Sequence, residues 1–136
     1  LNVAVLTGIA KGQKKKVDDL RKSKLLSEAR IITVNAYTCT EEADIEDMIG
    51  RHGYTALVKE AYGLKELKLD DKPTERVVKD VEDAFRMLPP ETAEFDHFFP
   101  SSFLIENPAV IKTLPGYDAA LDRFEQLFKD LNNFIA

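Results

Sequence analysis

The densest group of side chains that could do chemistry is an acidic segment in the first half of the chain. Five carboxylates fall within seven residues: Glu41, Glu42, Asp44, Glu46 and Asp47. Such a group could hold Mg²⁺ or Mn²⁺, because hard cations prefer oxygen ligands. Acidic side chains also stabilise helix N-termini, where they complement the helix dipole. Asp44 as an N-cap, with Asp47 three residues later, fits a reciprocal cap, and the residues taken alone favour this structural interpretation.

A second candidate site is the turn at residues 7–12, between an apolar predicted strand and a lysine-rich predicted helix. Such junctions often carry functional groups, because the carboxyl end of the strand and the N-terminus of the helix meet at one crevice. This turn contains no acid, His or Cys. Gly8 and Gly12 are four positions apart and Gln13 follows, which matches neither the phosphate-binding loop nor the dinucleotide fingerprint. We therefore expect no nucleotide site, and glycines that serve the backbone of the turn.

The third candidate is a patch of lysines, which comprises Lys11, Lys14, Lys15 and Lys16. Residues 11–24 hold seven cations and two acids, so this stretch carries +5 while the rest of a chain of net charge −5 carries −10. This asymmetry argues against a general affinity for nucleic acid but leaves one patch suited to phosphates. The alternative is a solvated helix face without a ligand.

Cysteine and histidine are too few for several kinds of site. Cys39 is the single cysteine, which excludes an internal disulfide and fits a reducing cytoplasm. With only His52 and His97 beside it, a zinc site of the usual Cys/His kind is excluded. We expect a half-buried Cys39 and two histidines in structural or surface positions. The longest apolar runs are too short to span a bilayer, so no membrane partner is expected.

The elements around these sites predict an α/β fold. Strands are predicted near residues 2–6 and 31–35, with a helix over 13–26 between them, which is the pattern of a right-handed βαβ unit with a parallel pair. The inward-facing positions of this helix are Val17, Leu20 and Leu25.

The second half of the chain is predicted to be almost entirely helical. A helix over 53–62 ends at Gly63, and 64–69 is a short extended piece. Pro73 suits the first position of a helix that continues to residue 88. An aromatic loop at 95–100 precedes a short helix capped by Ser101 or Ser102, and the last helix covers 117–135. We therefore divide the chain into an α/β part, 1–70, and a helical part, 71–136, packed on it.

Taken together, the apolar strand, the turn, the lysine-rich helix, the sequence SKLL, a second apolar strand and EADIED resemble the Toprim domain of OLD-family (overcoming lysogenization defect) proteins. The sequence PGYDAALDRFEQLFKDLN resembles the helical end of the same proteins. These proteins couple an ABC-type ATPase to a C-terminal Toprim nuclease. The resemblance covers most of the chain, and EADIED is its strongest element.

The resemblance implies a small, mainly parallel Toprim-like sheet and a metal site that this chain has partly lost. In the family the first strand ends in Asp-x-Asp, with a glycine following. Matching the spacing places these two acids at Thr7 and Ile9, with Gly12 in register. The family's additional glutamate lies on an earlier βα unit, so we expect this chain to be a C-terminal fragment that lacks that unit.

The remaining family positions are acidic: Asp44 and Glu46, with Asp47 beside them, would bind Mg²⁺ or Mn²⁺. Because two-metal phosphodiester cleavage needs several carboxylates to hold two cations about 4 Å apart, we expect nuclease activity to be impaired. Expected partners are DNA, contacted through the lysines, an upstream ATPase domain and a second copy of the chain.

Two other functions stay open. One is a non-enzymatic interaction or dimerisation module that uses the amphipathic segments 73–88 and 117–135. The other, a phosphotransfer or receiver-like domain, is disfavoured by the missing acids at the end of the first strand.

Overall fold

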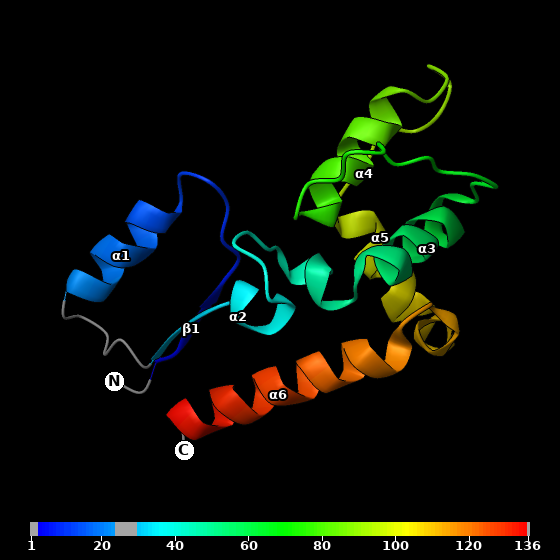
Figure 1. Cartoon of the computed structure of the whole chain (residues 1–136). Helices are drawn as coiled ribbons and strands as arrows, with labels where there is room; N and C mark the ends of the chain where they lie inside the picture. Colours follow the sequence, from blue (N-terminus) through cyan, green and yellow to red (C-terminus); the bar gives the residue numbers. More distant parts are fainter. Residues whose placement is uncertain (1–2, 24–29, 136) are drawn as a thin grey trace.

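The computed structural model describes residues 3–23 and 30–135 (Figure 1). It is an α/β structure with one two-stranded parallel sheet and a majority of helices. In Figure 1 the sheet and α1 (Lys14–Lys22) lie at one end of the molecule, α3 (Arg51–Tyr62), α4 (Val77–Arg86) and α5 (Phe98–Glu106) lie at the other, and α6 (Tyr117–Ile135) runs beneath both.

The predicted βαβ unit is present. β1 (Val5–Thr7) and β2 (Ile31–Thr33) pair in parallel, with Val5 opposite Ile31 and Thr7 opposite Thr33. α1 is shorter than the predicted helix and buries Val17 against the rest of the chain. The expected inward position Leu25 lies outside the described residues, as does the start of the first predicted strand.

The acidic segment leads into a single 3₁₀ turn rather than a regular helix. A short helix α2 (Asn35–Thr38) precedes it, and the turn η2 covers Ile45–Met48. Asp44 is the N-cap of η2, and its backbone N–H donates to the Asp47 carboxylate over 2.7 Å. The structural interpretation of this pair as a cap is therefore confirmed.

α3 follows the prediction closely and ends at Gly63, whose positive φ of 64° suits a residue without a Cβ. The prediction that Pro73 opens the next helix is wrong, because α4 begins four residues later, at Val77. Side chains hold the intervening residues outside the helix: Asp80 accepts from the Thr74 N–H and Asp47 from the Val77 N–H. The predicted extended piece at 64–69 pairs with no strand in the part of the chain that is described.

The aromatic segment after α4 is also more helical than predicted. α5 begins at Phe98, so the expected cap at Ser101 or Ser102 is wrong. The carboxylate of Asp96 performs that role by accepting the Phe98 N–H over 2.9 Å. A 3₁₀ segment, η3 (Pro108–Thr113), connects α5 to α6, which has the predicted bounds.

Two hydrophobic clusters hold these elements together. The first joins α3 to α4 through Tyr54, Leu57, Val58, Val77, Val78, Val81 and Phe85, with Leu114. The second joins β2 and η2 to α6 through Ile32, Val34, Ala43, Met48 and Leu127. Both clusters combine residues from either side of residue 70, so the division into 1–70 and 71–136 stays a prediction.

Within the described ranges, no helix has both the length and the apolar character needed to cross a membrane.

Candidate functional site

The fold brings the turn after β1 against the acidic segment. Ile9 and Ala43 form an antiparallel bridge in which each backbone N–H donates to the other residue's carbonyl, over 2.8 and 2.9 Å. Gly8 lies so close that a Cβ built on it would be 3.0 Å from the Ala43 carbonyl oxygen and 3.4 Å from the Asp44 carboxylate. The two candidate sites that the sequence separates by more than thirty residues are therefore one place in the structure.

None of the three positions that match the family's Asp-x-Asp and glycine, which are Thr7, Ile9 and Gly12, offers an acidic ligand there. The Thr7 hydroxyl donates to the Gly8 carbonyl over 3.0 Å. Ile9 is buried, with 8% of its surface exposed. Gly12 has a φ of 92° and open space around it, which explains a glycine at this point of the turn.

Asp44 is neutralised by an arginine from a distant loop. The guanidinium of Arg76 contacts both carboxylate oxygens, with Nε at 2.7 Å and Nη2 at 3.2 Å. This two-point geometry is the strong form of an Arg–carboxylate pair. Its hydrogen bond to Asp44 raises the pKa of Arg76.

The carboxylate of Asp47 accepts hydrogen bonds from the backbone. Its two carboxylate oxygens accept the N–H groups of Asp44 and Val77, at 2.7 and 2.9 Å. Burial raises the pKa of Asp47, and these two hydrogen bonds oppose that rise. The side chain thus links the start of η2 to the start of α4.

Glu46 differs from Asp44 and Asp47 because no side-chain ion pair and no hydrogen bond from another residue holds its carboxylate among the described residues. Burial, more than any other cause, raises the pKa of Glu46, and the nearby negative charges of Asp44 and Asp47 act in the same direction. Glu46 is therefore a partly buried carboxylate that neither an arginine, as for Asp44, nor a neighbouring backbone, as for Asp47, compensates.

These contacts do not fit a two-metal centre. Asp44 is held by Arg76, both oxygens of Asp47 accept backbone N–H groups, and the family's other acids are replaced by Thr7 and Ile9. Among the described residues, no group of three or more His, Cys, Asp or Glu side chains is placed to hold a metal ion.

The lysine patch lies on the turn and on α1, which stands apart from α3, α4 and α5 in Figure 1. Lys11, Lys14, Lys15 and Lys16 are all exposed. The ion pairs found in the described ranges include none of these four lysines. Their charges are therefore free to meet an anionic partner.

The cysteine and histidine predictions have different outcomes. Cys39 is exposed, not half-buried as expected, because it ends the short helix α2 in a left-handed conformation with a φ of 58°. His52 is exposed, and the partly exposed His97 ring contacts Glu82 over 2.6 Å. Both histidines are thus surface residues, as predicted.

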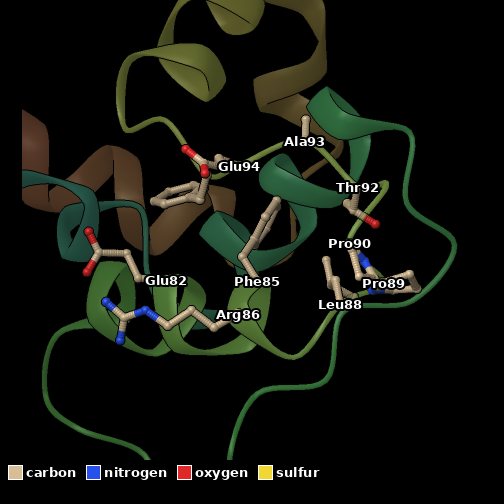
Figure 2. Close-up of a pocket in the computed structure, with 10 residues that line it drawn as sticks. Glu82, Phe85, Arg86, Leu88, Pro89, Pro90, Thr92, Ala93 and Glu94 are labelled. Carbon is tan, nitrogen blue, oxygen red and sulfur yellow. The ribbon is translucent and has the colours of Figure 1, made fainter.

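The structure also shows two concave surfaces that sequence patterns did not indicate. A cavity of about 420 Å³ lies between the end of α4 and the following loop, and Figure 2 shows Glu82 and Arg86 beside Phe85, with Pro89 and Pro90 along the loop. Two of its charged groups are paired, Glu82 with His97 and Arg86 with Asp83, whereas the third, Glu94, forms no ion pair among the described residues.

Another concave surface is a groove of about 320 Å³ between η2, α3, α5 and α6. Glu46 and Tyr54 lie among the apolar side chains that line it. Nothing in the sequence marked Tyr54 as more than a core residue, since it occupies an ordinary apolar position of its helix.

No family model matches this chain, and neither a curated protein nor a solved structure is significantly similar to it. The resemblance to Toprim domains therefore stays a prediction, and the functional argument depends on the residues and their geometry.

Proposed function

We propose that this chain is a Toprim-like domain of the OLD-family type that is catalytically impaired and contacts DNA. One observation supports the proposal: the Ile9–Ala43 bridge, with Gly8 close to the Asp44 carboxylate, brings the turn after β1 next to the acidic segment. A Toprim-like metal site requires this proximity, and neither segment predicts it alone. The proposed setting is a longer protein with an upstream ATPase domain. The exposed, single Cys39 fits a reducing cytoplasm.

The proposed loss of nuclease activity follows from the side chains at the expected metal-ligand positions. A two-metal nuclease needs carboxylates that face its ions, whereas here a threonine and a buried isoleucine stand at the two expected acidic positions. Arg76 supplies a fixed positive charge to Asp44, which disfavours a metal ion at the same place.

Weak binding of a single Mg²⁺ or Mn²⁺ ion stays part of the proposal, and it requires Arg76 to release Asp44. Arg76→Gln should therefore strengthen the Mn²⁺-induced broadening of amide signals near Asp44 and Glu46, while Arg86→Gln, in an exposed ion pair, should not. Broadening that is absent from both proteins would remove the metal from the proposal.

The proposed DNA contact uses the four lysines on the turn and α1. Their exposure and their lack of ion pairs within the described ranges leave them available for phosphates. Each lysine that neutralises a phosphate releases counterions, so binding should weaken steeply with salt.

The test compares two triple variants with equal loss of charge. Replacing Lys14, Lys15 and Lys16 with Gln should weaken binding to a duplex DNA. It should also reduce the steepness of the plot of log affinity against log salt concentration by about 1 for each lysine that contacts a phosphate. The control replaces Lys65, Lys68 and Lys72, which are also exposed. Equal weakening by both triple variants would show a net-charge effect and would contradict a defined DNA-binding face.

A non-enzymatic interaction module is the second candidate, and α6 is the element that favours it. Leu121 and Phe128 on α6 are 48% and 59% exposed, whereas the apolar face of α4 is buried within the chain itself. If α6 forms a dimer interface, sedimentation should detect a dimer that Leu121→Ser with Phe128→Ser dissociates. A chain that is monomeric at all concentrations would exclude dimerisation.

A further inference from the structure

The groove between η2 and α5 combines an apolar wall with two polar groups at one place. Ile49, Leu104 and Phe124 provide apolar surface from three different elements, while Glu46 and Tyr54 provide polar atoms. Ser101, which is exposed, adds a hydroxyl. The volume of the groove, about 320 Å³, is at the lower end of the range typical of small-ligand sites, which are mostly apolar with a few placed polar groups.

Tyr54 has an unusual position for a tyrosine. Only 1% of its surface is exposed, and its hydroxyl oxygen is buried without a hydrogen-bond partner among the described residues. Buried tyrosine hydroxyls nearly always have a partner, since an unsatisfied one is costly. A phenylalanine would fill the same space in the core without this cost. The hydroxyl therefore requires an explanation outside the packing of the protein.

The charge near this hydroxyl is negative. Burial is the main reason that the pKa of Tyr54 is raised, and Glu46 is the charged group that adds most to the rise. Asp44 is compensated by Arg76 and Asp47 by backbone N–H groups, whereas no side chain among the described residues forms an ion pair with Glu46. His97 opposes the rise in the pKa of Glu46, and its ring already contacts Glu82.

We propose that this groove binds a small organic cation, an ammonium group carried on a compact apolar body. The ammonium group donates a hydrogen bond to the Glu46 carboxylate and, as the side chains that cover it in the free protein move aside, a second one to the Tyr54 hydroxyl oxygen, while the apolar body lies against Ile49, Leu104 and Phe124. Both unmet requirements of the site, a hydrogen-bond partner and a positive charge, are met by one chemical group. A carboxylate ligand would meet the first requirement but would be repelled by Glu46.

The test is an NMR titration of the full chain with three probes that share one apolar body: n-hexylammonium, 1-hexanol and hexanoate. Hexylammonium should shift the amides of Glu46, Tyr54 and Leu104 and bind most tightly, with hexanol weaker and hexanoate weakest. Tyr54→Phe and Glu46→Gln should each lower the affinity for hexylammonium about tenfold, the effect expected for losing a hydrogen bond to a charged group. Neither variant changes the size of the side chain, so folding should persist.

Two matched substitutions control for the loss of a hydroxyl or a charge elsewhere. Tyr37→Phe removes a hydroxyl that bonds Asp130, and Glu125→Gln removes an exposed carboxylate; both should leave the affinity unchanged. Equal binding of hexylammonium and hexanol, or full affinity in Glu46→Gln, would overturn the proposal. So would shifts confined to amides outside the groove.

A fourth probe separates a free ligand from a lysine of another protein. Nα-acetyl-lysinamide carries the same ammonium group on a peptide-like unit. Weaker binding than hexylammonium is expected, and stronger binding would overturn the assignment to a small free ligand. None of these outcomes depends on DNA binding by α1, so this proposal and the proposed function fail separately.

Discussion

At the scale of single residues, two tyrosines with similar chemistry have opposite environments. The Tyr37 hydroxyl donates to the Asp130 carboxylate over 2.7 Å, while the Tyr54 hydroxyl is buried without a partner among the described residues. Burial raises the pKa of both hydroxyls, so both remain neutral at physiological pH. Their contributions to stability should nevertheless differ in sign.

Tyr54→Phe is expected to raise the free energy of unfolding by about 1–3 kcal/mol, because it removes a buried hydroxyl that lacks a hydrogen bond. Tyr37→Phe should lower it by about 1 kcal/mol, because a satisfied hydrogen bond is lost. Urea denaturation of both variants measures the two changes. A loss of stability in Tyr54→Phe similar to that in Tyr37→Phe would show that the Tyr54 hydroxyl is satisfied in solution.

Glu46 predicts a pH dependence of stability. Burial raises the pKa of Glu46 above its value of 4.5 in the unfolded chain, so the folded state holds the proton more tightly than the unfolded state does. The contribution of Glu46 to stability is therefore greatest below the unfolded pKa and is lost as the pH rises through the folded pKa. Asp44 and Asp47 add to the rise in this pKa, and His97 opposes it.

Glu46→Gln removes this dependence, and the variant should be more stable than the wild type at neutral pH. The advantage should disappear below about pH 4, where Glu46 is protonated in both states. Thermal unfolding at a series of pH values measures the difference. An advantage that is constant with pH would mean that the carboxylate is fully solvated.

At the scale of elements, Asp80 fixes the long connection between α3 and α4. Its carboxylate is 97% buried as a side chain, forms an ion pair with Arg51 at 2.6 Å and accepts the Thr74 N–H with both oxygens. The same contacts explain why α4 begins at Val77 and not at Pro73. One side chain thus joins α3, the loop and α4.

Asp80→Ala should lower the free energy of unfolding by about 3 kcal/mol, because it leaves a partly buried Arg51 and a backbone N–H without their acceptor. Asp83→Ala, in the exposed ion pairs of the same helix, provides the control and should change stability little. Chemical denaturation of both variants tests this. Similar small effects would show that water replaces Asp80 easily.

At the scale of the whole molecule, α6 connects the two ends of the fold. Leu127 is buried against β2 and η2, while Ala120 and the residues before it lie near η3 and Leu114. Since η2 also contacts α3 and α4, the latter through the hydrogen bond from Val77 to Asp47, we expect the α/β end and the helical end to unfold together.

Leu127→Ala is expected to lower the free energy of unfolding by about 2–5 kcal/mol through the cavity it leaves. Phe128→Ala, at the neighbouring but 59% exposed position, should change it by about 0.5 kcal/mol or less. Hydrogen exchange at Val34 and Val81 then measures both ends of the molecule. Faster exchange at Val34 alone would contradict a single cooperative unit.

The amino-acid sequence determined the local features of this protein. The βαβ order, the end of α3, the bounds of α6, the stripe Val77–Val78–Val81–Ala84–Phe85 and the cap of Asp44 and Asp47 follow from periodicity and from neighbours within a few residues. The absence of acids at Thr7 and Ile9 is likewise a property of the sequence.

Only the tertiary structure decided which partners the functional side chains have. Arg76 meets Asp44 across 32 positions, and Asp47 reaches Val77 across 30, distances at which no local spacing rule applies. The same is true of the Tyr54 hydroxyl, whose lack of a partner depends on four elements that pack around it. Helices and turns are set by contacts along the chain, whereas the neutralisation of a buried charge depends on how separate elements pack. Because of that packing, Asp44 and Asp47 form structural contacts instead of the predicted metal site, and Glu46 forms no ion pair among the described residues.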